Sequence, residues 1–189
     1  MKPKLVILSD LFGANAIDWL TAYRKELSNW FEIQFYDVQK LAEIENNKFL
    51  EEKLHHEFVN GGIDKAVTKL LSIEKEPIQI LAFSIGGTIA WKAILKGLKC
   101  TSLYAISSTR LRNEIRNLLD TDTLLFYGEL DFNKPLPEWF AKMEMNSATF
   151  FENETHEMYK SKSIIAQICA LIIERTKKKS LPLSIYEGI

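Results

Sequence analysis

The segment Pro77-Ile-Gln-Ile-Leu-Ala-Phe-Ser-Ile-Gly-Gly-Thr-Ile-Ala90 decides the fold. Residues 78–83 form a short, nearly continuous apolar run, which is typical of a strand buried on both faces of a parallel sheet. The run stops at Ser84, and from Ile85 onward apolar residues recur at helical spacing. The segment therefore predicts a strand, a serine, two glycines and a helix in direct succession.

A serine in such a sharp turn is a candidate nucleophile. Strand and helix nearly collide there, so the residues two positions away must be small, and Ala82 and Gly86 meet that requirement. The Ile85 N–H and the helix N-terminus then point at the serine and favour a developing negative charge. This is the geometry of a nucleophile elbow, although the strict pattern G-x-S-x-G has alanine in its first position here. The alternative is a serine that only caps the helix.

Composition excludes several classes of protein. A chain of 189 residues that is 47% hydrophobic is large enough for one real core and is not mainly disordered. A formal net charge of −1 shows no strongly basic face for nucleic acid. We expect one domain over residues 1–180 and a loose tail at residues 181–189. Cys100 and Cys169 lie in apolar surroundings and are interpreted as buried, reduced thiols.

The sequence predicts a soluble, cytoplasmic protein. The apolar run after Met1 has only four residues, so we expect no secretory signal. The longest apolar run, residues 164–173, is broken by Gln167 and is too short to span a bilayer.

Strand and helix patterns alternate along the chain. Strands are predicted at residues 5–8, 33–36, 78–83, 102–107, 123–127 and 148–151, with helical segments between them, including residues 110–119. Such alternation indicates βαβ units with right-handed crossovers. The predicted fold is a single α/β domain with a mostly parallel six-stranded sheet and helices on both faces.

Ligands bind beyond the carboxyl ends of the strands in such a sheet. Ser84 follows the third strand, Asp131 the fifth and His156 the sixth. A serine needs a base within hydrogen-bond reach, and the imidazole needs an acceptor that holds its tautomer. The order Ser84, Asp131, His156 is the one that α/β-hydrolases use. Taken singly, Asp131 could cap a turn and His156 could be an exposed loop residue.

Residues 37–60 are polar and only loosely periodic, and a helix is expected within residues 41–58, over or outside the upper edge of the sheet. The segment contains His55 and His56, whose spacing fits no strong metal-ligand pattern. We therefore predict a solvated helix face rather than a metal site, and no metal or organic cofactor. A partial lid is suggested by position alone.

The whole chain resembles a compact α/β-hydrolase, and residues 9–15 are similar to the dienelactone hydrolase branch. The family usually has two further strands before the one with which this chain begins. The resemblance implies an acyl-enzyme mechanism in which Ser84 attacks, His156 shuttles the proton and Asp131 orients the ring. It also implies an oxyanion hole formed by the backbone N–H groups of Ile85 and Leu11.

The expected substrate pocket is apolar and aromatic, lined by Phe12, Phe83 or Ile85, Phe132, Trp139 and Met158. Residues of these types at such places can equally be plain core. Dienelactone hydrolases use cysteine as the nucleophile, so Ser84 favours a generic small ester or thioester.

The leading hypothesis is a serine hydrolase for small carboxylic esters or thioesters. The alternatives are a binding protein that keeps the fold without turnover, and an acyltransferase that uses the same residues. Neither nucleic acid nor a membrane is an expected partner, and the oligomeric state is left open.

Overall fold

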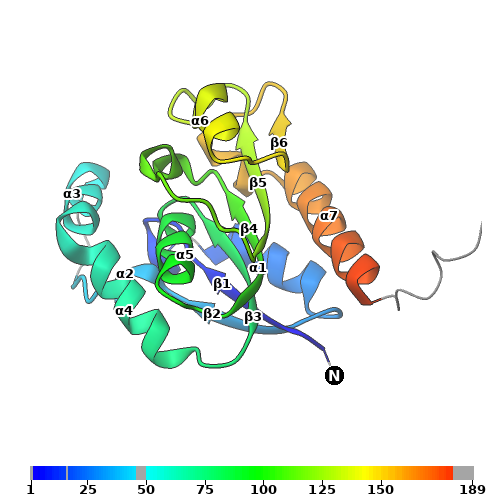
Figure 1. The fold of residues 1–189 in the computed structure, drawn as a ribbon, viewed down its shortest axis with the longest axis horizontal. Coiled ribbons are helices and arrows are strands. Elements are labelled where there is room, and N and C mark those ends of the chain that lie inside the picture. The colour runs from blue at the N-terminus through cyan, green and yellow to red at the C-terminus, as the bar shows by residue number, and fades with distance from the viewer. Residues whose placement is uncertain (1, 16, 46–49, 181–189) are drawn as a thin grey trace, which may run out of the picture.

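The computed structural model of the chain describes residues 2–15, 17–45 and 50–180. Its centre is a six-stranded sheet in which every pair of neighbouring strands is parallel (Figure 1). The strand order is β2-β1-β3-β4-β5-β6. The strands are β1 Lys4–Leu8, β2 Glu32–Tyr36, β3 Ile78–Phe83, β4 Cys100–Ile106, β5 Asp122–Gly128 and β6 Ala148–Phe151. The predicted α/β fold is confirmed, and the sheet is wholly parallel.

Helices connect successive strands. The α-helices are α1 Ile17–Leu27, α2 Val38–Leu41, α3 Glu51–Glu57, α4 Ile63–Ile73, α5 Ile85–Leu95, α6 Pro137–Lys142 and α7 Lys162–Ser180. Short 3₁₀ turns occupy η1 Gly13–Asn15, η3 Thr109–Asn113 and η4 His156–Lys160. The π-helical turn η2 Phe58–Gly62 joins α3 to α4, with a kink at Gly61 (φ 117°).

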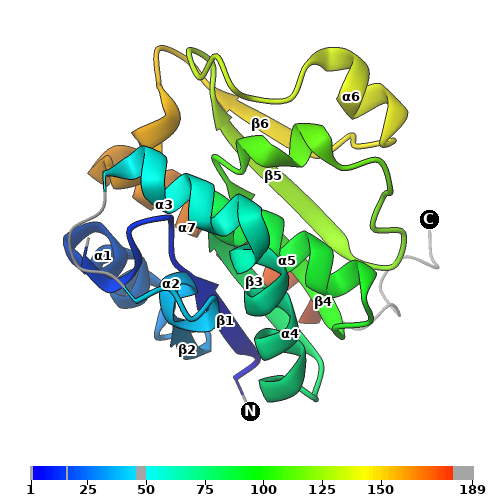
Figure 2. The ribbon, with the colours of Figure 1, turned by 90° about the vertical axis from the view of Figure 1, so that its left-hand side faces the viewer.

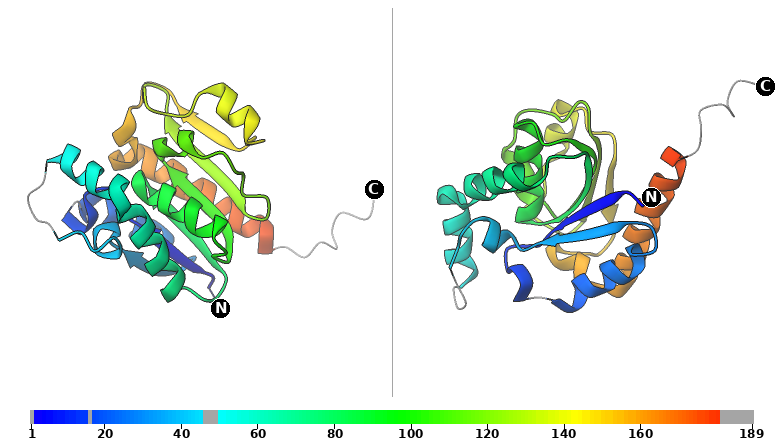
Figure 3. Two further views of the ribbon diagram at one scale, coloured as in Figure 1. Left: turned by 60° about the vertical axis from the view of Figure 1, so that its left-hand side comes forward. Right: turned by 90° about the horizontal axis from the view of Figure 1, so that it is seen from below.

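Side chains alternate across the sheet and form two cores, because successive strand residues point to opposite faces. On one face, Val6, Ile80 and Leu103 pack with residues of α4 and α5. On the other, Leu5, Leu81 and Tyr104 pack with residues of α1 and α7. Figure 3 shows helices covering both faces of the sheet.

The predicted helix over residues 110–119 is only the short turn η3. The chain that follows it is held in place by two buried tryptophans, whose indole N–H groups bond to backbone carbonyls. Trp139 donates to the Glu114 carbonyl at 2.9 Å and Trp91 to the Arg116 carbonyl at 3.1 Å. These carbonyls are bonded from outside the segment rather than by a continuing helical ladder, so the segment runs as an ordered loop.

The helix expected within residues 41–58 is divided into α2 and α3, and residues 46–49 between them lie outside the description. Helix α3 continues through η2 into α4 and lies toward the end of the sheet where the strands finish (Figure 2). The predicted tail, residues 181–189, is also outside the described residues. None of the helices in the described part combines the length and apolar character that a bilayer crossing requires.

Candidate active site

Ser84 occupies the strained turn between β3 and α5. Its backbone has φ 49° and ψ −115°, a region that non-glycine residues rarely adopt and that occurs preferentially at functional sites. Gly86 makes the close approach possible, since a Cβ there would lie 2.5 Å from the Ser9 carbonyl oxygen. Ala82 is fully buried between Leu8 and Ala105 of the flanking strands. Small residues at both positions therefore let strand and helix meet at this serine.

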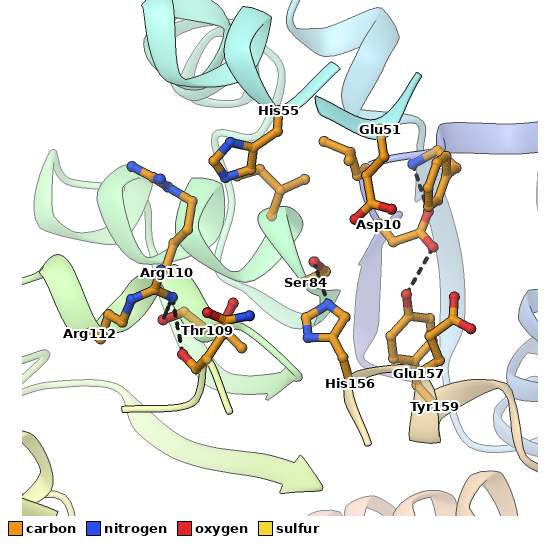
Figure 4. A pocket seen from close by; sticks show the side chains of 14 residues that line it. Asp10, Glu51, His55, Ser84, Thr109, Arg110, Arg112, His156, Glu157 and Tyr159 are labelled. Carbon is orange, nitrogen blue, oxygen red and sulfur yellow. Dashed lines mark hydrogen bonds between the residues drawn. The ribbon is translucent and has the colours of Figure 1, made fainter. Parts of the chain in front are cut away.

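Ser84, His156 and Asp131 form a continuous hydrogen-bonded chain. Ser84 Oγ lies 3.1 Å from His156 Nε2, and a dashed line marks this hydrogen bond in Figure 4. On the other side of the ring, His156 Nδ1 lies 2.7 Å from Asp131 Oδ2. With a proton on Nδ1, the ring donates to the carboxylate and leaves Nε2 free to accept from the serine hydroxyl.

The Asp131 carboxyl is buried, with 3% of the residue exposed, at the turn that follows β5. Burial acts to raise its pKa. The hydrogen bonds from His156 and from the Asn133 N–H at 3.0 Å, with the charge of Lys134, outweigh that effect and lower the pKa below its usual value. Asp131 is therefore held as a carboxylate that can fix the tautomer of the imidazole and stabilise its protonated form.

The end of β5 is shaped so that the loop bearing His156 can reach it. Gly128 lies against the carbonyls of Glu154 and Thr155, where a Cβ would collide with either oxygen. The backbone bond from Leu130 N–H to the Glu154 carbonyl, at 2.9 Å, also joins the two loops. The side chain of His156 is 36% exposed, so solvent reaches the imidazole from outside.

The loop after β1 forms another wall beside Ser84. Asp10 is almost fully buried, accepts from the Phe12 N–H at 3.0 Å and accepts from the Tyr159 hydroxyl at 3.1 Å. Burial raises the pKa of this carboxyl, although these hydrogen bonds and Lys160 oppose the shift. Leu11 and Phe12 are thereby held in a fixed turn next to the serine.

A cavity of about 500 Å³ opens above Ser84. The segments that follow β1, β3, β4, β5 and β6, together with α3, contribute to its wall. The lining residues are Asp10, Leu11, Phe12, Glu51, His55, Ser84, Ile85, Thr109, Arg110, Arg112, Asn133, His156, Glu157 and Tyr159. The segment predicted as a partial lid thus supplies Glu51 and His55 to this wall. The cavity is more polar and more charged than the sequence predicted.

Of the predicted pocket residues, Phe12 and Ile85 line the cavity, as does Leu11, which was predicted for the oxyanion hole; the other predicted pocket residues lie elsewhere. Phe132 points to solvent and is 96% exposed. Trp139 is buried in the core with its indole bonded to the Glu114 carbonyl. Met158 is buried in the opposite core. Placing these residues in the pocket was wrong, because Phe132 turns outward from its loop, whereas Trp139 of α6 and Met158 of η4 pack into the two cores.

The sequence analysis missed the cationic residues of the cavity. Arg110 and Arg112 were assigned to a helix, whereas η3 carries them directly past the end of β4, where they line the cavity. Their position just after a predicted strand was the signal that could have found them. His56, beside the cavity residue His55, bonds instead to the Asn60 side chain at 2.7 Å. Across the described ranges, no group of three or more His, Cys, Asp or Glu side chains is placed to hold a metal.

Comparison with solved structures identifies the architecture. The protein Est1E of Butyrivibrio proteoclasticus, solved with ferulic acid bound, superposes with a TM-score of 0.67 at 10% identity, covering 94% of this chain and 89% of that one. A carboxylesterase of Nitrososphaera gargenis gives 0.63 at 13% identity, with 94% and 92% covered. The chain has the α/β-hydrolase fold.

A dienelactone hydrolase-like promiscuous phosphotriesterase from metagenomic libraries shares this α/β-hydrolase fold, with a TM-score of 0.64 at 11% identity and coverage of 94% and 86%. No protein-family model and no curated protein sequence matches the chain. At such low identity the likeness extends to the fold, and the chemistry must be argued from this chain's own residues.

Proposed function

We propose that this protein is a serine hydrolase that cleaves small carboxylic esters or thioesters through an acyl-enzyme. The observation that carries the proposal is the hydrogen-bonded succession from Ser84 Oγ through the His156 ring to Asp131. Its position at a strained strand–helix turn under an open cavity gives an ester carbonyl room to approach.

In the first half-reaction Ser84 Oγ attacks the carbonyl carbon while its proton passes to His156 Nε2. Asp131 stabilises the imidazolium that forms. The tetrahedral oxyanion accepts hydrogen bonds from the backbone N–H groups of Ile85 and Leu11. The Phe12 N–H is already bonded to the Asp10 side chain, which favours Leu11 as the donor from this loop.

Collapse of the tetrahedral intermediate breaks the ester bond, and His156 returns the proton to the leaving alcohol or thiol. In the second half-reaction His156 takes a proton from water, whose oxygen attacks the acyl carbon. The acid then leaves and Ser84 regains its proton. The exposure of the His156 side chain supports water as the acceptor, since solvent reaches the imidazole directly.

The test is labelling with a fluorophosphonate probe together with hydrolysis of 4-nitrophenyl butyrate. Ser84→Ala should abolish labelling and lower kcat/KM by at least ~10³-fold, because nucleophile and base act as a unit. Ser72→Ala changes an exposed serine on α4 and is the matched control, with labelling and rate unchanged. Equal rates for wild type and Ser84→Ala would exclude the mechanism. Product analysis with added alcohols separates hydrolysis from acyl transfer.

A further inference from the structure

One wall of the cavity is cationic. Arg110 and Arg112 reach it from η3, just after β4, and His55 reaches it from α3. Figure 4 shows the Arg110 side chain extending toward His55, to one side of Ser84. These three side chains come from segments more than 50 residues apart in the sequence and meet only around this space.

Within the described ranges, neither guanidinium of this wall has a carboxylate partner. Among the residues that the structure describes, no ion pair forms to Arg110 or Arg112, and the buried Nε of Arg110 has no hydrogen-bond acceptor. Arg112 Nη1 donates to the carbonyls of Thr109 and Asn133, each at 3.0 Å, and these acceptors are neutral. The nearby Glu114 is paired with Lys92 at 3.1 Å.

The two guanidinium groups act on each other and on the His55 imidazole, so the charge of this wall rests on the arginines. Burial lowers the pKa of His55, and the charges of Arg110 and Arg112 lower it further, against a smaller opposing effect of Glu51. Burial also lowers the pKa of Arg110, with Arg112 adding to the shift and Glu114 opposing it. A negatively charged group between these side chains would relieve that repulsion and supply the missing acceptor.

The opposite side of the cavity carries carboxyl groups, of which Glu157 is paired with Lys160 while Glu51 and Asp10 form no ion pair among the described residues. Asp10, Glu51 and Glu157 lie across Ser84 from the two arginines (Figure 4). A negatively charged ligand is therefore attracted to one side of the serine and repelled from the other. The charge distribution can orient a substrate as well as bind it.

We propose that Arg110, Arg112 and His55 form an anion subsite, and that the substrate is an ester or thioester with a carboxylate or phosphate group beyond the scissile carbonyl. This inference rests on the proposed function and adds the substrate class. Guanidinium groups suit such ligands because their planar donors match two oxygens of one anion. Arg110 is the principal contact, since Arg112 is partly engaged by backbone carbonyls.

The kinetic test compares two substrates that differ only in charge, mono-4-nitrophenyl adipate and its methyl ester, both followed by release of 4-nitrophenol. Wild type should prefer the anionic substrate in kcat/KM. Arg110→Met should lower kcat/KM for the anionic substrate by about 10- to 100-fold, and change that for the neutral substrate less than about 2-fold. Arg110→Lys should retain part of the preference, because it keeps the charge but not the planar donor set.

Lys96→Met is the matched control, since it removes an exposed positive charge that pairs with Asp64 far from the cavity wall. Thermal unfolding checks that each variant is folded. The inference is wrong if wild type shows no preference, if Arg110→Met lowers both substrates equally, or if Lys96→Met has the same effect.

A binding test separates this inference from the proposed chemistry. In the Ser84→Ala background, calorimetry with monomethyl adipate and with monobutyl phosphate measures anion binding without turnover, and the tighter of the two identifies the anion. Adding Arg110→Met should weaken that binding at least ~10-fold. Binding without esterase activity in wild type would remove the proposed function and keep the subsite; absence of binding to both ligands would remove the subsite.

Discussion

The two ends of the sheet differ in whether their polar groups have partners. At the amino ends of the strands, charges are paired. Asp122, the first residue of β5, bonds to Arg175 Nε at 2.9 Å and to Lys179 Nζ at 2.7 Å. Lys4, the first residue of β1, pairs with the buried Glu74 at 2.7 Å.

At the carboxyl ends, strain and unpaired polar groups accumulate. Ser84 and Ser107, which follow β3 and β4, both have φ 49°. The Oγ of Ser107 and the Nε of Arg110 are buried, and neither has a hydrogen-bond partner in the described part of the chain. Asp10 is buried with its pKa raised.

The difference follows from the chemistry proposed for one end. Paired charges at the amino ends satisfy one another and make a modest contribution to the stability of the fold. A site that binds a substrate must keep donors and charges available, so its own stability is lower. The comparison predicts that changes in activity arise from the carboxyl ends, whereas changes at the amino ends alter stability and leave activity unchanged.

The largest expected effect is the loss of activity when the proposed base, His156, is removed. His156→Ala should lower kcat/KM for 4-nitrophenyl butyrate by about 10³- to 10⁴-fold, because Ser84 loses the acceptor for its proton. The free energy of unfolding should also fall by about 1–2 kcal/mol, because the buried Asp131 carboxylate loses the hydrogen bond from His156. A variant with wild-type turnover would show that the carboxyl-end serine acts without this imidazole.

The next largest effect is expected from a substitution in the turn between β3 and α5. Gly86→Ala should lower the free energy of unfolding by about 2–3 kcal/mol, because the new Cβ meets the backbone oxygen of Ser9. Activity should fall with it as Ser84 is displaced. Gly97→Ala is the control: it has positive φ but open space around it, and should cost only about 1 kcal/mol without loss of activity. Urea unfolding and ester hydrolysis measure both.

At the amino end, Asp122→Asn should destabilise the fold by about 1 kcal/mol at pH 7 and leave kcat/KM unchanged, since the pair is partly exposed. The hydrogen bond from Arg175 is the main cause that lowers the pKa of Asp122 below its usual 3.8. The stabilisation is therefore fully present above about pH 4 and is lost as the pH falls through the lowered pKa. Urea unfolding should show the two proteins converging in acid; a constant difference would mean that charge is not the cause.

The smallest effect is expected at Asp10. Its folded pKa is raised above 3.8, mainly by burial, so ionisation destabilises the folded state increasingly as the pH rises through that raised value. Asp10→Asn removes this cost and should raise stability by about 0.5–1 kcal/mol at pH 7, with no gain below pH 3. The amide can still accept from the Phe12 N–H. Thermal unfolding at pH 7 and below pH 3 measures the change in stability. A loss of stability at pH 7 would contradict the prediction.

Ser84, Asp131 and His156 could be found from the sequence because each follows a strand. In a parallel sheet all carboxyl ends lie on one edge, so residues far apart in the chain are brought together by topology alone. The need for small residues beside Ser84 could also be predicted from the sequence, because the close approach of strand and helix involves only neighbouring residues.

The charged wall could not be found in this way. Whether Arg110 lies on a helix or past the end of β4 depends on two tryptophans, Trp91 and Trp139, whose indoles bond to the loop after η3. The directions of Phe132 and Met158 likewise depend on loop conformation. By itself the sequence determined the sheet, the turn at the serine and the edge where the polar residues meet, because these follow from hydrophobic periodicity and local sterics. Only the tertiary structure decided which side chains face the cavity and with what charge, since loop packing is set by contacts between distant segments.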